Sequence, residues 1–236
     1  MPFDILDFHA HILPRADHGS DSVETSKKQL RFAYACGVRR IIATPHFYPN
    51  EHSVSEFFSL RDTAYRELLA SVSEKAGYPE IRLGCEVLCC EGISRLPRLE
   101  DFCISGTRTI LLELPFSYFS ERFAEDVRNL ISMGYEVVLA HADRYSPKNI
   151  DTLLRVGAKI QLNADSLVGL FVPKHIKSWL KSGAVVAIGS DIHMRDSSAY
   201  KRFVRAAERI KAYPCVLLES DRIWRQSSII KEKQLV

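Results

Sequence analysis

Two pairs of potential metal ligands share the same spacing, and each pair follows a short apolar run. His9-Ala10-His11 comes after Leu6-Asp7-Phe8, and Asp191-Ile192-His193 comes after the last apolar run of the chain. Residues two apart on a strand point to the same side, so both side chains of a pair can reach one metal ion. A single histidine on a strand is more often structural, but two equally spaced pairs at two strand ends indicate a metal site.

Histidines and glutamates also stand at the ends of four further apolar runs. His46 follows Thr44-Pro45, and His141 follows another run; each of these two, taken alone, is as often structural as functional. Glu86 and Glu113 end two more runs, where a carboxylate is costly unless it is paired or bound to a metal. We therefore expect the two glutamates to bridge metal ions.

This set of imidazoles and carboxylates contains no thiolate, which favours Mn, Fe or Zn over a structural zinc site or a calcium site. The candidate ligands are more numerous than one ion can use, so two or three divalent or trivalent ions are expected. Clustered ions hold phosphate oxygens and activate a water between them. The ligand set therefore predicts phosphoryl chemistry.

The elements that must position these residues follow a repeated pattern of strand and helix. Short runs rich in β-branched residues, typical of buried parallel strands, are expected at 5–8, 40–43, 81–84, 110–112, 137–140, 160–162 and 184–188. Helices are expected at 22–36, 54–75, 122–133, 153–156, 173–181 and 200–212, most of them ending before a glycine. The pattern predicts a parallel barrel or a doubly wound sheet, in which the carboxyl ends of the strands form the functional face.

Length and composition exclude several classes of protein. The 236 residues fit one α/β barrel without a linker or repeat, so a single domain over residues 1–236 is expected. The net charge of +3, with mixed signs along the chain, gives no case for nucleic acid. No apolar stretch reaches the ~18 residues of a transmembrane helix, and no signal peptide is seen, so membrane insertion is not expected. Six cysteines in a chain with an ample core indicate reduced thiols and a cytoplasmic protein.

Taken together, the motifs resemble the polymerase-and-histidinol-phosphatase (PHP) superfamily. The matching segments, which span residues 3–211, are His-x-His, Thr44-Pro45-His46, the two strand-end glutamates, Ala140-His141-Ala142-Asp143-Arg144-Tyr145 and Ser190-Asp191-Ile192-His193. Within the superfamily, the length and the His9-Ala10-His11-Ile12-Leu13-Pro14 opening are similar to the manganese-dependent protein-tyrosine phosphatases of bacterial capsule and exopolysaccharide operons. The resemblance implies a distorted (β/α)7 TIM-like barrel, the PHP fold. It also implies a trinuclear metal site, for which Mn is the first candidate.

The resemblance also implies which residues bind the metals. Carried over one by one, the ligands are His9, His11, His46, Glu86, Glu113, His141, Asp191 and His193. A ninth ligand precedes Gly19, where the branch usually has Asp-Asp-Gly and this chain has Asp17-His18-Gly19. We expect His18 to be this ligand, with Asp17 as the alternative.

Two phosphate-binding arginines are part of the same resemblance. Arg144, three residues after His141, matches the first, and a solvent-facing structural arginine is the alternative reading. The second arginine usually lies five residues after the Asp-x-His motif, where this chain has Ser198. Arg195 is the nearby residue that would substitute for it in binding substrate.

The implied function is hydrolysis of phosphotyrosine on a protein partner, expected to be a cognate bacterial tyrosine kinase of polysaccharide biosynthesis. Arg144, His141 and Glu113 would act in catalysis. Two alternatives stay open: a phosphatase of a small metabolite such as histidinol phosphate, and a metal-holding regulatory protein without turnover. The second alternative follows from the departures at His18 and Ser198.

One further motif predicts different chemistry. Cys89-Cys90-Glu91-Gly92-Ile93-Ser94-Arg95 fits Cys-x-x-Gly-x-x-Arg, the loop of the cysteine-dependent tyrosine phosphatases. In such a loop, backbone amides and an arginine hold the phosphate while a thiolate attacks it. The pattern is short and arises easily by chance, and it leaves the strand-end histidines unexplained, so we rank it well below the metal site.

Overall fold

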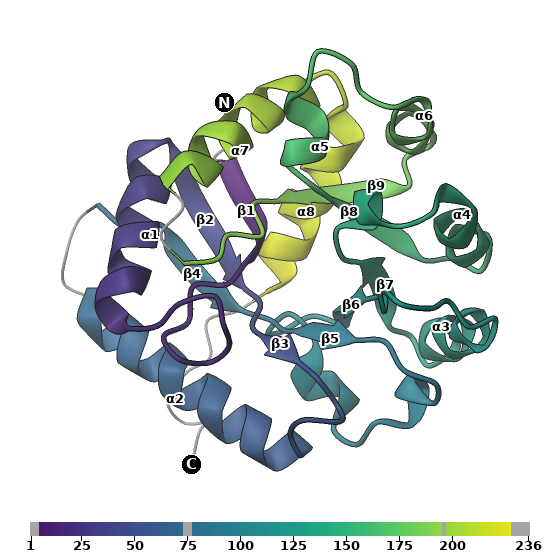
Figure 1. The fold of residues 1–236 in the computed structure, drawn as a ribbon, viewed down its shortest axis with the longest axis horizontal. Coiled ribbons are helices and arrows are strands. Elements are labelled where there is room, and N and C mark those ends of the chain that lie inside the picture. Colours follow the sequence, from purple (N-terminus) through teal and green to yellow (C-terminus); the bar gives the residue numbers. More distant parts are fainter. Residues whose placement is uncertain (1–4, 73–76, 195–196, 228–236) are drawn as a thin grey trace.

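The computed structural model describes residues 5–72, 77–194 and 197–227, and within them every strand pairing is parallel. The strands lie at the centre of the molecule and the helices surround them (Figure 1). The strands are β1 (Ile5–Ala10), β2 (Val38–Ala43), β3 (His46–Phe47), β4 (Glu80–Leu83), β5 (Glu86–Leu88), β6 (Thr109–Glu113), β7 (Glu136–Leu139), β8 (Lys159–Asn163) and β9 (Val185–Gly189). The predicted parallel α/β class is confirmed, and each of the seven expected runs lies on a strand.

Two of the expected strands are each interrupted near the carboxyl end. The strand pairs form two sheets, in the orders β1-β2-β4 and β3-β5-β6-β7-β8-β9. The chain passes from β2 to β3 through Thr44-Pro45 and from β4 to β5 through Gly84-Cys85, and the Glu86 amide still donates to the Pro45 carbonyl at 3.0 Å. Proline has no amide hydrogen to donate to a ladder. The interruption therefore lies directly before His46 and Glu86, which are paired in the register of β3 with β5.

The two ends of the strand series approach each other. Figure 1 shows β1 between β2 and β9. The Asp191 amide donates to the His9 carbonyl at 2.8 Å, and the His11 amide donates to the Ile192 carbonyl at 3.2 Å. These bonds join β1 to the segment after β9, although the described residues contain no ladder between β9 and β1. Closure into a distorted (β/α)7 barrel therefore stays a prediction.

The helices begin and end largely where turn residues predict. They are α1 (Val23–Ala35), α2 (Val54–Val72), α3 (Arg122–Ser132), α4 (Pro147–Arg155), α5 (Asp165–Val168), α6 (Lys174–Ser182), α7 (Ser197–Ile210) and α8 (Pro214–Gln226), with 3₁₀ turns η1 (Ile93–Arg95), η2 (Leu99–Phe102) and η3 (Ala142–Arg144). The Ser22 hydroxyl caps α1 by accepting from the Thr25 amide at 3.2 Å. Three helices differ from the expectation: α4 begins six residues before the expected start, and α5 and α8 were not expected at all.

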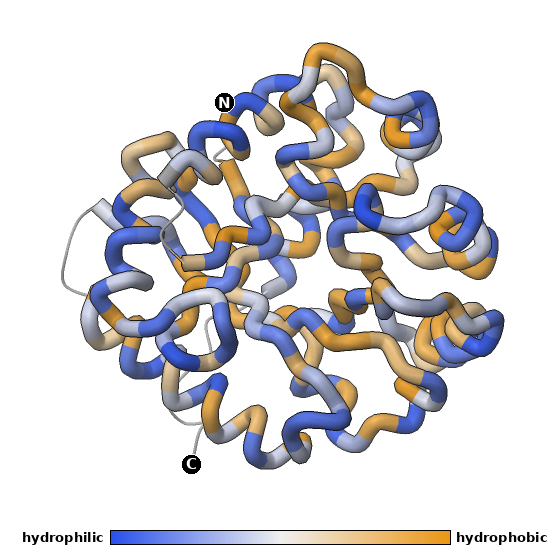
Figure 2. The backbone as a smooth tube through the Cα atoms, in the orientation of Figure 1, coloured by the Kyte–Doolittle hydropathy of each residue, from blue (hydrophilic) through white to orange (hydrophobic). Residues whose placement is uncertain are grey.

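The core fills the space between strands and helices. Figure 2 shows largely hydrophobic central strands and hydrophilic residues on the outer turns of the helices. A smaller buried cluster joins Phe8, Val138 and Val186 of three strands to Ile223 and Trp224 of α8. None of the helices in the described part of the chain is both long and apolar enough to cross a membrane.

Candidate metal centre

The eight candidate ligands predicted from the sequence come together at the carboxyl ends of the strands. Their side chains belong to β1, β3, β5, β6 and the segments after β1, β7 and β9, so residues from seven parts of the chain meet at one place. All of them except His193 are at most 9% exposed. They are His9, His11, His46, Glu86, Glu113, His141, Asp191 and His193.

Glu86 lies at the middle of this cluster and contacts four imidazoles. Its Oε2 is 3.1 Å from His9 Nε2, 3.2 Å from His11 Nε2 and 3.0 Å from His46 Nδ1. Its Oε1 is 2.7 Å from His141 Nε2. Burial alone would raise the pKa of Glu86, but the charge of His9 and the hydrogen bonds from the histidines hold it well below its usual value. Glu86 is therefore a carboxylate at neutral pH.

Three overlapping groups of side chains have the geometry to hold an ion. Within each group the potential ligand atoms lie within 4.8 Å of one another. The groups are His11 with His46 and His193, then His9 with His11, Glu86 and Asp191, and finally His46 with Glu86 and Glu113. Any two of the groups have one residue in common, which is His11, His46 or Glu86. Ions in these positions would therefore be neighbours, as in clustered phosphoesterase sites.

Several buried polar atoms of the cluster lack a hydrogen bond within the described residues. They are His46 Nδ1, Glu113 Oε2, His141 Nδ1 and His193 Nε2, and the 3.0 Å contact of His46 Nδ1 with Glu86 Oε2 does not have hydrogen-bond geometry. A buried polar atom without a partner is destabilising, and metal coordination would supply partners for such atoms. Imidazole nitrogens with carboxylate oxygens are the donors that Mn, Fe and Zn prefer. The residues present therefore fit a site for these metals.

Asp17 does not face the centre but holds His11 in place. Its Oδ2 accepts from His11 Nδ1 at 2.7 Å and from the His46 amide at 3.0 Å, and its Oδ1 accepts from the Gly19 amide at 2.8 Å. Burial alone would raise the pKa of Asp17, yet the charge and hydrogen bond of His11 hold it below its usual range. The bond to Nδ1 leaves His11 Nε2 directed at Glu86.

His18 lies at the outer side of the same cluster. It is an exposed residue whose ring centroid is 4.6 Å from that of His193 and 4.9 Å from that of His46, in stacked arrangements. Among the described residues, it belongs to none of the three ligand groups. Both oxygens of Asp17 are engaged by other donors, whereas the ring of His18 stacks on two candidate ligands, and the choice of His18 as the ninth ligand stays a prediction.

Two buried amides that sequence reasoning missed connect the ligands from behind. Gln161 Oε1 accepts from the His141 amide at 2.8 Å and from His9 Nδ1 at 3.1 Å, and Gln161 Nε2 donates to Asn163 Oδ1 at 3.2 Å. Asn163 Nδ2 donates to Asp191 Oδ2 at 2.9 Å. Both amides lie on β8 and point the same way. The only available signal was a glutamine inside the apolar run Ile160-Gln161-Leu162.

Two glycines allow the backbone to pack against the first histidine pair. A Cβ added at Gly19 would lie 2.1 Å from His11 Cβ, and one added at Gly189 would lie 2.5 Å from His9 Cβ. Both contacts are closer than non-bonded carbons allow, so any side chain at these places would displace a ligand.

Arg144, the expected phosphate-binding residue, stands at the mouth of the centre. It ends η3, its side chain is 44% exposed, and its Nη2 lies 2.5 Å from Asp191 Oδ2. Its guanidinium is thus both held by a cluster carboxylate and open to solvent. Arg195 lies outside the described residues, and Ser198, which stands at the position of the usual second arginine, accepts from Arg202.

The cysteine loop has a different role from the one that its motif suggests. The Asp126 carboxylate accepts from the amides of Gly92 at 2.8 Å and Ser94 at 3.3 Å, and from the Ser94 hydroxyl at 2.6 Å. An internal carboxylate thus takes the place that a phosphate would need. Cys89 is fully buried, and burial raises the pKa of its thiol, so it is not a thiolate nucleophile. All six cysteines are free.

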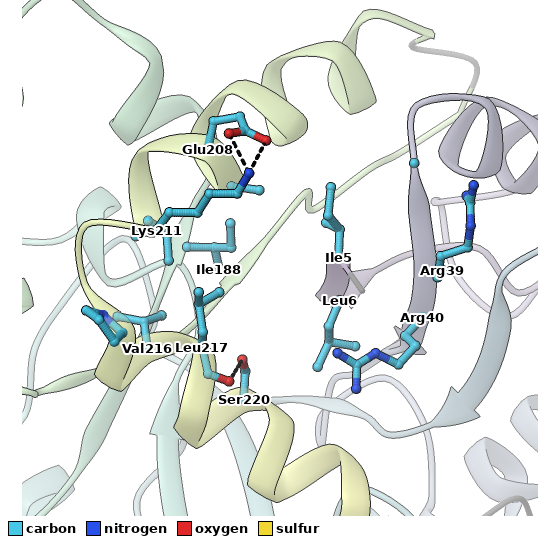
Figure 3. A pocket seen from close by; sticks show the side chains of 14 residues that line it. Ile5, Leu6, Arg39, Arg40, Ile188, Glu208, Lys211, Val216, Leu217 and Ser220 are labelled. Atoms are coloured by element: carbon cyan, nitrogen blue, oxygen red, sulfur yellow. Dashed lines mark hydrogen bonds and ion pairs between the residues drawn. The ribbon is translucent and has the colours of Figure 1, made fainter. Parts of the chain in front are cut away.

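A cavity of about 650 Å³ lies at the other end of β1 and has no comparable chemistry. It is lined by apolar residues of β1, β9 and α8, including Leu6, Ile188 and Val216 (Figure 3). Its charged and polar side chains have partners: Lys211 binds Glu208 at 2.6 Å, the Ser220 hydroxyl donates to the Leu217 carbonyl at 3.1 Å, and Arg40 donates to Asp221 at 2.7 Å. The candidate site is therefore the histidine cluster.

A family model and curated proteins that resemble this chain agree with one another. A family model described as "Capsular polysaccharide synthesis, CpsB/CapC" matches residues 5–212. The tyrosine-protein phosphatase YwqE of Bacillus subtilis is 29% identical over 80% of this chain and 77% of its own. The putative tyrosine-protein phosphatase CapC of Staphylococcus aureus is also 29% identical, over 80% and 77% of the two chains.

Among solved structures, one chain from a study of YwqE of B. subtilis and CpsB of Streptococcus pneumoniae, described as unique metal-dependent tyrosine phosphatases, is similar with a TM-score of 0.74. It is 21% identical and the match covers 96% of both chains. At 21% identity this similarity shows that the two chains share a fold.

Proposed function

The chain belongs to the CpsB/CapC family of capsular polysaccharide synthesis, and from this premise we propose that it is a metal-dependent phosphatase that hydrolyses phosphotyrosine on proteins. Its relatives are named tyrosine-protein phosphatases, and the similar solved structure is described as metal-dependent. The single observation that carries the proposal is Glu86, a buried carboxylate that contacts four imidazoles and belongs to two of the three overlapping ligand groups.

We assign the clustered side chains as ligands of two or three divalent or trivalent metal ions. Mn is the first candidate, and Fe and Zn are the alternatives. The ligands would be His9, His11, His46, Glu86, Glu113, His141, Asp191 and His193, with His18 as the ninth. When bound, the ions would supply positive charge to the phosphoryl oxygens and activate a water molecule.

The residues around the ions have separate tasks. Arg144 would bind phosphoryl oxygens and neutralise their charge, because its guanidinium is partly exposed and anchored on Asp191. Asp17 and Gln161 keep the Nε2 atoms of His11 and His9 directed inward. His141 and Glu113 would act in catalysis by holding the ions beside the phosphoryl group. Their side chains are close enough to do this together, because His141 Nε2 lies 3.5 Å from Glu113 Oε1.

A tyrosine ester suits this arrangement. The leaving phenolate has a pKa of about 10, lower than that of an alkyl alcohol, so less proton donation to the leaving oxygen is required. The family's role in capsular polysaccharide synthesis supports a cognate bacterial tyrosine kinase as the partner and the cytoplasm as the location.

A panel of three phosphate esters tests the proposal. The Mn-loaded protein is assayed with a phosphotyrosine peptide, histidinol phosphate and a generic aryl phosphate. We expect the phosphotyrosine peptide to have the highest kcat/KM. A preference for histidinol phosphate would indicate a small-metabolite phosphatase, and no turnover of any of the three would indicate a regulatory metal-binding protein.

A further inference from the structure

The segment that follows Glu113 presents aromatic side chains to solvent beside the metal centre. It runs from Leu114 to Ser120, between β6 and α3. Within it Phe116 is 65% exposed and Tyr118 is 53% exposed. A large apolar side chain at this exposure gains little from folding, because most of its surface stays in water. Its position next to a cluster of ligands therefore points to a role in binding.

Contacts at both ends hold this segment in place. At its start, the Tyr145 hydroxyl donates to the Leu114 carbonyl at 2.8 Å. At its end, the Ser120 hydroxyl donates to Glu91 at 2.7 Å, and the Phe119 ring packs edge-on against Phe123 at 5.8 Å. Since the anchored ends leave only the middle in solvent, Phe116 is displayed by an ordered backbone, which lowers the entropy lost on binding a ligand.

The Phe116 ring is stacked on the outer side of the cluster. Its centroid is 6.0 Å from that of His141, at an interplanar angle of 14°, and 5.3 Å from that of Tyr145, at 24°. His141 is 1% exposed and Phe116 is 65% exposed, so the stacked pair leads from the buried cluster to solvent. The Glu86 carboxylate contacts His141 and His46, and the half-buried Tyr48 is stacked on His46 at 4.9 Å. Aromatic rings thus border the centre beyond two of its histidines.

We propose that Phe116 binds the aryl ring of the substrate and makes the site prefer aryl over alkyl phosphate esters. The proposal rests on the proposed phosphatase function and names the part of the ester that the site recognises. A phosphoryl group bound near Arg144 and the ligand cluster places the ester substituent at the exposed rim, where an aromatic ring can pack against Phe116. Aromatic pairs are worth about two- to tenfold in affinity beyond the area that they bury. An alkyl ester gains no such contact.

Binding of two phosphonates tests this proposal without turnover. Affinities of phenylphosphonate and methylphosphonate are measured by calorimetry for the Mn-loaded wild type and for Phe116→Ala, Phe116→Tyr and Phe171→Ala. Phe171 is 88% exposed between α5 and α6 and serves as the matched control for loss of an exposed aromatic residue. The ratio of the two affinities cancels any effect of a substitution on the metals, since both ligands share the phosphonate group.

We expect the wild type to bind phenylphosphonate more tightly, Phe116→Ala to lose about two- to tenfold of that preference, and Phe116→Tyr and Phe171→Ala to keep it. A wild type without preference, or a Phe116→Ala ratio equal to that of the wild type, overturns the proposal. Failure of the phosphatase function appears separately, as absence of phosphotyrosine hydrolysis by the wild type, because the binding ratio does not depend on turnover.

Discussion

Single residues decide which nitrogen of His9 and of His11 faces Glu86. His9 and His11 each use Nδ1 for a partner outside the cluster, Gln161 and Asp17, and so direct Nε2 inward. Such outer partners fix the tautomer of a histidine ligand and orient its ring. The centre therefore depends on residues that are not ligands as well as on those that we assign as ligands.

Replacing Gln161 tests this dependence. Gln161→Met keeps a similar volume but removes the acceptor for His9 Nδ1 and the His141 amide, so two ligands lose their orientation. We expect the affinity for Mn to fall by about 10- to 100-fold, measured by competition with a chelator. Thr109→Val, a buried polar change at the start of β6, is the control and should leave the affinity unchanged. Equal affinities for Gln161→Met and wild type would show that the amide is not needed.

His18 and Asp17 are separated by counting metal ions. If His18 is a ligand, His18→Ala should lower the number of bound ions by one per chain, counted by elemental analysis of the dialysed protein. Asp17→Asn should leave the number unchanged at saturating metal but weaken binding, because it perturbs the orientation of the assigned ligand His11 without removing a ligand. The reverse pattern would assign the ninth position to Asp17.

The sequence allows the clustering of these histidines and carboxylates to be predicted, but not the residues that pack behind them, such as Gln161, or beside them, such as Phe116. Histidines and glutamates at strand ends are predictable because parallel topology brings those ends together and such groups are costly there without a partner. Gln161 has no motif, since an amide on a strand has many structural uses. Phe116 has none either, because its exposure depends on a loop whose path the sequence does not specify.

At the scale of elements, α8 is tied to the strands by two arginines. Arg82 of β4 lies 4.1 Å from the Trp224 ring centroid and donates to the Ser227 hydroxyl at 2.7 Å. Arg40 of β2 donates to Asp221 at 2.7 Å. These contacts, with the packing of Ile223 and Trp224 in the smaller core cluster, attach the last helix to the first strands of the chain.

The pair of Arg40 with Asp221 gives stability a pH dependence. Burial alone would raise the pKa of Asp221, but the hydrogen bond and charge of Arg40, with the charge of Arg225, hold it below its usual value. Such a carboxylate contributes stability that is present above the pKa of the unfolded chain, about 3.9, and that is lost as pH falls through the folded-state pKa. Asp221→Asn should therefore lower the free energy of unfolding by about 1–2 kcal/mol at pH 7.

Urea unfolding at several pH values measures this effect, and the difference from wild type should shrink below about pH 4. Asp165→Asn is the control. The Asp165 side chain is 64% exposed, and its ion pair with Arg202 lies at the surface, where such a pair contributes little to the free energy of unfolding. A difference that stays constant down to pH 2 would mean that the ion pair is not its source.

The elements were predictable where one local signal dominates. Seven apolar runs predicted strands, and Ser22 and Gly37 predicted the two ends of α1. The missed helix α8 begins at Pro214, which reads as a stop after the preceding helix but is also the favoured first residue of a new one. The interruptions before His46 and Glu86 were not predictable, because they depend on pairing between strands.

At the scale of the whole molecule, the parallel topology gathers ligands from residue 9 to residue 193 at one end of the strands. No short segment holds the complete site, so metal ions held by this cluster would bind the folded chain and not the unfolded one. Binding to the native state alone stabilises it by mass action, by about 2.7 kcal/mol at a metal concentration of 100 Kd. This links the site to the stability of the fold.

Removal of metal should accordingly lower the melting temperature. With Mn at about 100 Kd we expect a rise of about 5–10 °C over the chelated protein, followed by calorimetry. His141→Ala should show a smaller rise, since it lacks one assigned ligand. A melting temperature that does not respond to Mn would contradict a metal site in this fold.

The most direct test of the central claim measures phosphotyrosine-peptide hydrolysis together with the bound metal. The wild type is assayed after metal removal and after reloading with Mn, beside His141→Ala with its fold checked by circular dichroism. We predict activity that disappears with the metal, returns in proportion to bound Mn, and falls about 10²-fold or more in His141→Ala. Full activity in the metal-free protein or in His141→Ala would contradict the account.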